Sequence, residues 1–394
     1  MRIFTFIAAA FFLAPHLSAQ DGITFENSSS SLKMIKMPSR QNSAADYDVA
    51  DVLYDEPAAA PPKAQPQKPP PAPPPAAAAQ KKPKIPRDDI KWSKRPSGNF
   101  DIFSQPRTTG VPTANLNLRF ETVHQTLRRN IPWLVAGKSD VFVYQNRADF
   151  LKHEPQAMNW SSAFFSPAEN CIVMYDDPKN IDNIIAQFTH ELTHLFVESY
   201  FNPPSAAYKA EAPIWFNEGL AVNMEDMSAN YKGGVWAGDL AVINILPAPA
   251  VPASDGRARL QPAAQGRPSY PGGPRISDTT VYFRDFGSFM RDDSYDKAVA
   301  GNYVEDWYFQ AYAMIRFLFK PFNAQYPEKR MQFEQLTKQL KNYDAARGAR
   351  VSSEAALKSV YGFKDAAAFE AAFYKWLYDL QKTERAKILQ QQST

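Results

Sequence analysis

The sequence has very little cysteine, with Cys171 alone among 394 residues. One thiol excludes an intrachain disulfide framework and any cysteine-rich zinc or iron–sulfur site. Histidine is scarce as well, with five residues, so a metal site would have to combine these few imidazoles with carboxylates. No strong excess of positive charge is present either, because 44 basic residues face 41 acidic ones. This near-balance argues against a nucleic-acid partner.

Long apolar runs are also missing, apart from a short one at the N-terminus. Positive charge at Arg2 precedes an apolar run that ends at Pro15, and small residues follow up to Ala19. This order is typical of a secretory signal peptide over residues 1–19, and the run is too short to span a bilayer comfortably. We therefore expect an exported protein, periplasmic or extracellular and of bacterial type, without a transmembrane segment after signal removal. An uncleaved anchor or a buried strand is the alternative interpretation.

The segment from residue 20 to 95 has little with which to form a core. Residues 28–31 are all serine, and twelve of the 33 prolines fall between Pro57 and Pro86. Such a sequence cannot bury enough apolar surface to offset its ordering entropy, and its prolines favour an extended conformation. We expect a disordered tail and a Pro/Ala/Lys-rich linker. The alternative is a spacer or ligand through which the chain meets an envelope partner.

Residues 96–394 carry the periodicities of a folded domain. Residues 228–276 are rich in Gly, Pro, Ala and Arg and are expected to form a flexible insertion in it. Helices precede and follow a group of strands, which predicts an α+β fold with a helical C-terminal half. The predicted helices are 114–133, 148–153, 181–201, 213–226, 303–321, 327–342, 352–360 and 365–385, and the predicted strands are 139–145 and a pair joined by the turn at 166–170.

One pentapeptide carries most of the chemistry. The helix predicted over 181–201 contains His190-Glu191-Leu192-Thr193-His194. Two histidines four positions apart lie one turn apart on one helix face, so both imidazoles can reach one metal ion. Glu191 is offset by one residue, where a base acting on water held by the metal belongs. A catalytic zinc needs a third protein ligand from a neighbouring element. Glu218, in the next predicted helix, is the candidate for it.

The two motifs together resemble a known family. HELTH followed by Trp215–Ala221 (WFNEGLA) is similar to the gluzincin branch of zinc metallopeptidases, in particular the bacterial peptidase MA-like domains. Weaker similarity covers about residues 115–385 outside the insertion, including the segments that begin at Asp140 and Tyr308. The resemblance implies a thermolysin-like zincin core, a small mixed sheet plus the HExxH helix, with a helical C-terminal subdomain.

The resemblance also implies a tyrosine or histidine that supports the oxyanion. Tyr308 is the candidate and Tyr312 the alternative, although Tyr308 would serve equally well as a packed aromatic residue. Asn217 could orient the substrate backbone. In thermolysin-like enzymes a carboxylate four residues after the ligand glutamate supports a ligand histidine. That position is Val222 here, so the support would have to come from Glu225 or Asp226.

These observations predict zinc-dependent, endopeptidase-type hydrolysis of protein or peptide substrates. In this hypothesis His190, His194 and Glu218 hold Zn²⁺, Glu191 activates the water, and Tyr308 assists. The alternative is a non-catalytic envelope scaffold or binding protein built on a metallopeptidase fold. The intact motif argues against that alternative, because a scaffold needs neither the three ligands nor the base.

Overall fold

The computed structural model describes the chain from Arg87 onward, with gaps. The described residues are 87, 89–155, 157, 161–206, 208–226, 240, 243–247, 280–291, 293–301, 303–319 and 327–392. The expected signal peptide, nearly all of the expected linker and most of the expected insertion lie outside them. Within the described part, no helix has both the length and the apolar character that a membrane span requires.

The N-terminal half is built around a five-stranded mixed sheet in the order β1-β2-β3-β5-β4. β2, β3 and β5 run parallel to one another, while β1 and β4 pair antiparallel at the two edges. The strands are β1 (Ser93–Pro96), β2 (Phe100–Ser104), β3 (Ser139–Tyr144), β4 (Ala163–Ser166) and β5 (Cys171–Tyr175), and the helices of this half are α1 (Leu116–Asn130), α2 (Arg147–His153) and α3 (Ile181–Phe201).

Alternation along the strands gives the sheet two buried faces. Val141, Val143 and Ile172 join the main core, in which α1 and α3 pack, whereas Tyr144 and Val173 join a smaller cluster with Phe150 of α2. β4 divides in the same way, with Phe165 in the main core and Phe164 in the smaller cluster. This is the behaviour of strands whose successive side chains point to opposite faces.

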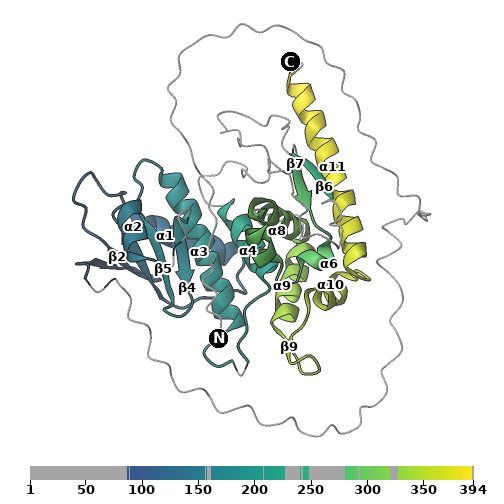
Figure 1. Cartoon of the computed structure of the whole chain (residues 1–394), viewed down its shortest axis with the longest axis horizontal. Coiled ribbons are helices and arrows are strands. Elements are labelled where there is room, and N and C mark those ends of the chain that lie inside the picture. The colour runs from purple at the N-terminus through teal and green to yellow at the C-terminus, as the bar shows by residue number, and fades with distance from the viewer. Residues whose placement is uncertain are drawn as a thin grey trace. The chain divides into compact units, whose positions relative to one another are not determined.

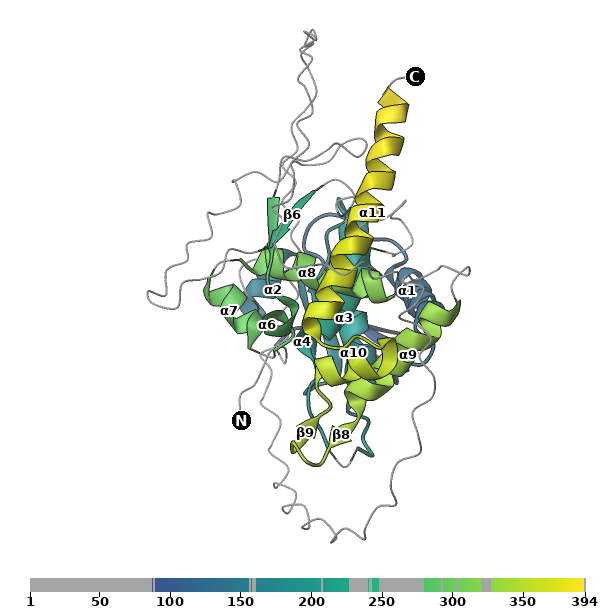
Figure 2. The same cartoon turned by 90° about the vertical axis from the view of Figure 1, so that its right-hand side faces the viewer.

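The C-terminal half is mainly helical and shares the main core with the sheet. Figure 1 shows α3 and α4 between the sheet elements and the later helices, and α9 and α10 pack together beside the start of α11 (Figure 2). The helices are α4 (Ile214–Glu225), α6 (Phe286–Phe289), α7 (Ser294–Ala300), α8 (Val304–Leu318), α9 (Pro327–Lys341), α10 (Ser353–Tyr361) and α11 (Ala366–Gln392), and the strands are β6 (Asn244–Pro247), β7 (Thr280–Phe283), β8 (Tyr343–Asp344) and β9 (Ala349–Arg350).

The predicted α+β class is confirmed at the level of a mixed α/β arrangement with a small mixed sheet. α3 has the bounds expected for it, because the side chain of Asn180 accepts a hydrogen bond from Asn183 N–H at its start and Pro203 follows its end. Three pairs of short strands were not expected. β6 lies inside the predicted insertion and pairs with β7 in parallel, β8 pairs with β9, and β1 pairs with β2.

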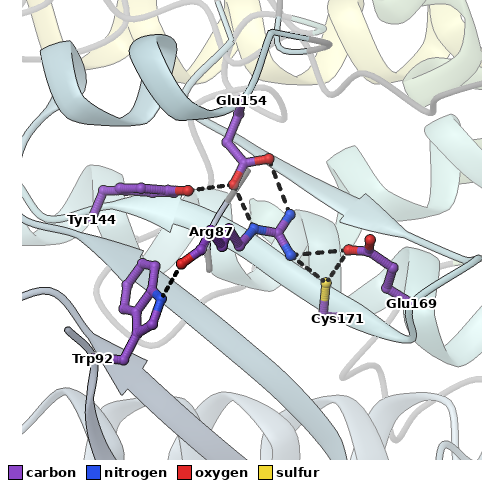
Figure 3. Close-up of polar contacts among 6 residues, drawn as sticks. All are labelled: Arg87, Trp92, Tyr144, Glu154, Glu169 and Cys171. Carbon is purple, nitrogen blue, oxygen red and sulfur yellow. Dashed lines mark hydrogen bonds and ion pairs between the residues drawn. The ribbon is translucent and has the colours of Figure 1, made fainter. Parts of the chain in front are cut away.

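The folded part of the chain extends N-terminally of residue 96, where the domain was expected to begin. Arg87 is buried and makes two ion pairs, one with Glu154 after α2 and one with Glu169 in the β4–β5 turn. The hydroxyl of Tyr144 donates to Glu154, and the guanidinium also contacts the Cys171 sulfur (Figure 3). The segment that leaves the expected linker is therefore fastened to the sheet by a buried charged cluster, named here the Arg87 cluster (Arg87, Tyr144, Glu154, Glu169 and Cys171).

Candidate metal centre

α3 presents its two histidines side by side in the interior. His190 and His194 are each 1% exposed, and their ring centroids lie 4.8 Å apart. The helix is buried over nearly its whole length, so apolar neighbours such as Phe188 and Leu192 hold it against α1 and the sheet. The four-residue spacing therefore places both imidazoles side by side in the protein interior rather than in solvent.

α4 brings the third side chain to the same point. Its close packing on α8 depends on Gly219, because a Cβ there would lie 2.5 Å from the carbonyl oxygen of Ala311. The neighbouring residue is Glu218, whose Oε2 lies 3.4 Å from His190 Nε2 and 3.5 Å from His194 Nε2. One ligand atom from each of the three residues falls within 4.8 Å of the other two. The structure thus brings together the three residues that the sequence nominated as metal ligands.

The donor atoms fit a metal ion better than they fit one another. Two ligands at about 2.0–2.1 Å from a tetrahedral ion are roughly 3.4 Å apart, close to the separations seen here. His190 Nε2 and Glu218 Oε2 are buried, and their 3.4 Å contact does not have hydrogen-bond geometry, so neither atom has a hydrogen bond among the described residues. Leaving such groups unmatched costs about 1–3 kcal/mol each. A cation at their meeting point would satisfy both.

Two further side chains orient the imidazoles from behind. His190 Nδ1 lies 3.2 Å from Glu225 Oε2, and His194 Nδ1 lies 3.0 Å from Asn217 Oδ1. With an oxygen acceptor at each Nδ1, that nitrogen carries the proton and Nε2 keeps its lone pair for a metal. Of the two carboxylates considered for this support, the structure selects Glu225. Asn217, which could also orient the substrate backbone, faces His194 in this structure.

The electrostatics of the metal-free site favour a positive charge. Burial opposes protonation of His190, but the carboxylates of Glu218 and Glu225 outweigh it and raise its pKa to about 10. Burial likewise opposes ionisation of Glu218, but the two histidines lower its pKa to about 2. Without a metal, a proton on His190 supplies the positive charge, and a bound cation would displace it.

Glu191 lies beside the three ligands in a different chemical state. It is fully buried, and neither carboxylate oxygen has a hydrogen bond of ordinary geometry among the described residues. Burial raises its pKa to about 7, against the opposing charges of the two histidines and the nearby backbone N–H of Phe165 in β4. A carboxylate with this pKa is suited to take and return a proton near neutral pH.

Tyr295 lies on α7, and the two candidate tyrosines, Tyr308 and Tyr312, lie on α8. The hydroxyls of Tyr308 and Tyr295 lie 3.4 Å apart. Burial raises the pKa of Tyr295, and the negative charge of Glu218 raises it further, which places Tyr295 within electrostatic range of the site. Tyr312, the alternative to Tyr308, donates to Asp226 Oδ2 at 3.1 Å instead. The role of Tyr308 stays a prediction, now as one member of a pair.

Sequence reasoning did not assign a role to Tyr295 and left Glu225 as one of two options. The signal for Glu225 was present, because a residue seven positions after Glu218 returns to the same face of α4 after two turns. Tyr295 had no such signal, since it follows the insertion and belongs to a short helix that no periodicity predicted.

Comparison with known proteins adds no assignment. No protein-family model matches the chain, and no curated protein matches it at a significant level. Function is therefore inferred from the chain's own residues and their geometry.

Proposed function

We propose that this chain is a zinc metallopeptidase of the gluzincin type that hydrolyses peptide bonds in proteins or peptides. The observation that carries the proposal is the convergence of His190, His194 and Glu218 beside Glu191, a fully buried carboxylate that is not one of the three ligands. In this proposal the sheet, α3 and α4 form a zincin core, and the later helices form its C-terminal subdomain.

The choice of zinc follows from the donor set together with its neighbour. Two imidazoles and one carboxylate suit catalytic zinc, and they also suit iron(II) in oxygenases. A buried carboxylate that is not a ligand, with a pKa raised to about 7, supports hydrolysis because that reaction needs a base for water. Measured metal content separates zinc from iron directly.

Each residue of the site would have its own role in the hydrolysis. When bound, the metal would supply Lewis acidity to the water and to the scissile carbonyl. Glu191 would take the proton of the attacking water and pass it to the leaving amine. Glu225 and Asn217 would hold the imidazoles in their tautomers. The hydroxyl of Tyr308, paired with Tyr295, would donate to the negative charge that develops on the carbonyl oxygen.

The sheet edge supports an extended peptide as the substrate. β4 is the edge strand next to α3, and β5 is its one strand partner among the described residues. An edge strand can pair with an extended peptide through main-chain hydrogen bonds. The N–H of Phe165 lies near Glu191, so a peptide paired along this edge would pass the base.

We further propose that the protein is exported, with residues 1–19 as its signal and the Pro-rich segment as a linker that can contact an envelope partner. The competing proposal, a non-catalytic scaffold, is less consistent with the site. Unpartnered buried polar atoms cost stability, and a scaffold gains nothing from keeping them.

Metal analysis by mass spectrometry on the full chain tests the proposal. We expect one zinc per chain, lost in His190→Ala and Glu218→Ala. His153→Ala is the matched control, because this histidine ends α2, outside the metal site, and should keep the zinc. A parent chain that takes up no stoichiometric zinc, even after reconstitution, would contradict the proposal, and stoichiometric iron would redirect it.

A further inference from the structure

Gln187 is a buried polar side chain that has no role in the proposed reaction. It lies on α3, is 1% exposed, and neither its Oε1 nor its Nε2 has a hydrogen-bond partner among the described residues. A glutamine amide offers a donor and an acceptor, and buried amides are almost always paired. Such a residue needs an explanation.

Helix geometry places Gln187 on the face that carries the metal site. It precedes Glu191 by four positions and His194 by seven, and residues with these spacings share one side of a helix. One turn further toward the N-terminus, Asn183 also has a buried oxygen without a partner. A polar stripe (Asn183, Gln187 and Glu191) therefore leads away from the catalytic centre along α3.

A second buried glutamine shows what a structural amide looks like in this protein. Gln310 of α8 is equally buried, and its Nε2 donates to the carbonyl of Arg284 at 2.8 Å. Its Oε1 accepts from the N–H of the same residue at 2.9 Å. Both ends of Gln310 are thus used internally to hold the residue that follows β7, whereas neither end of Gln187 has a hydrogen-bond partner among the described residues.

We propose that Gln187 is a specificity-determining residue that binds a side-chain amide, asparagine or glutamine, of the substrate close to the scissile bond. This inference rests on the proposed peptidase function. The complement of one donor and one acceptor in a plane is another amide, which can form two hydrogen bonds with it.

The sheet explains why a side chain, rather than the main chain, reaches Gln187. A peptide paired with the edge of β4 would use its main chain on that edge and point alternate side chains to each face of the sheet. α3 packs on the face of β4 that carries Phe165. The substrate side chains on that face point toward α3, and Gln187 lies on the face of α3 that carries the site.

Peptide profiling with a stability control tests the inference. The zinc-loaded full chain is given a mixture of proteome-derived peptides, and new termini are read by mass spectrometry. Paired synthetic peptides then carry glutamine or methionine at the preferred position. We expect the parent to favour the amide by about tenfold or more, since a polar site rejects an analogue that leaves its groups unpaired. Gln187→Met should abolish that preference while cleavage continues.

Thermal unfolding separates this role from a structural one. Gln187→Met should leave the melting temperature unchanged or raise it, whereas Gln310→Met should lower it, because only the second change removes hydrogen bonds. The inference is overturned if Gln187→Met keeps the parent's preference, slows all peptides equally, or unfolds as early as Gln310→Met. Absence of any cleavage by the zinc-loaded parent would instead remove the peptidase function itself.

Discussion

Two buried polar clusters lie on the two sides of the sheet, and they differ in how completely they are hydrogen-bonded. In the Arg87 cluster each charge has its partner, because the Arg87 guanidinium bonds both carboxylates and the Tyr144 hydroxyl also reaches Glu154 (Figure 3). In the metal centre, by contrast, Glu191 and Glu218 retain buried oxygens without hydrogen bonds among the described residues.

The pKa values follow the same division. Burial opposes the charge on Arg87, yet its carboxylate neighbours raise its pKa beyond the ordinary value, so the ion pairs stay formed. Burial raises the pKa of Cys171 to about 12, which leaves an unreactive thiol. Glu191, with a pKa of about 7, titrates where cells operate. A fully hydrogen-bonded cluster stabilises the fold, whereas a cluster with unused donors and acceptors can bind a ligand and exchange a proton.

The largest effect should come from removing the base. Glu191→Gln keeps the shape of the side chain but cannot accept a proton, so we expect turnover to fall by about 10²–10⁴-fold while one zinc per chain remains. Steady-state kinetics and metal analysis on the same preparation measure both. Glu198→Gln, on the same helix, is the matched control and should keep most activity. Near-normal turnover by Glu191→Gln would refute the assigned mechanism.

Disrupting the Arg87 cluster should lower the free energy of unfolding and leave metal binding intact. Glu154→Leu leaves the buried Arg87 charge with Glu169 as its one remaining carboxylate partner among the described residues, and removing one partner of a buried pair costs about 3–5 kcal/mol. Adding Arg87→Met removes the stranded charge and should recover most of that loss. Denaturant unfolding of the single and double variants measures the difference. A double variant no more stable than Glu154→Leu would show that the charge is not what the cluster balances.

Of the two clusters, only the metal centre could be predicted from the sequence. The bounds of α3 and the nomination of His190, Glu191 and His194 came from local signals: a cap, a proline stop and a four-residue spacing. Glu218 followed because the Pro-rich turn after the first helix is long enough to bring the second helix back antiparallel beside it. Local patterns of this kind survive in the sequence because the chemistry fixes the spacing.

The Arg87 cluster could not be predicted, because no sequence pattern links its residues. Arg87 and Glu154 are 67 positions apart, and nothing periodic links them. Arg87 also lies in a Pro- and Lys-rich context, which the composition assigned to the linker. β1 was missed for a related reason, since all four of its residues are exposed and show no alternation. The unpartnered state of Gln187 is likewise a property of packing, not of spacing.

The metal centre should also make the stability of the metal-free protein depend on pH. The folded pKa of Glu191 is raised from 4.5 to about 7, so the folded state holds a proton that the unfolded state releases. Metal-free stability should therefore fall as pH rises from about 4 to 8, by about 3 kcal/mol from this residue alone.

Glu191→Gln cannot titrate and should lack that loss. Urea unfolding in the presence of a chelator, at both pH values, gives the comparison. An unchanged difference between parent and variant across this range would mean that Glu191 has an ordinary pKa and is less enclosed than the structure indicates.

The smallest effect should come from the residues that hydrogen-bond the Nδ1 atoms of the two ligand histidines. Glu225 accepts from His190 Nδ1 and Asn217 from His194 Nδ1, and such supports contribute about 10–100-fold to metal affinity. Glu225→Ala should weaken zinc binding more than Asn217→Ala, because a carboxylate increases the basicity of the imidazole more than an amide does. Competition with a chelating dye measures both affinities. Asp226→Ala removes the neighbouring carboxylate, which bonds Tyr312 instead, and should leave zinc affinity nearly unchanged. If Asp226→Ala weakens zinc binding as much as Glu225→Ala does, the net negative charge at the end of α4 increases zinc affinity. The specific contact between Glu225 and His190 would then not be its cause.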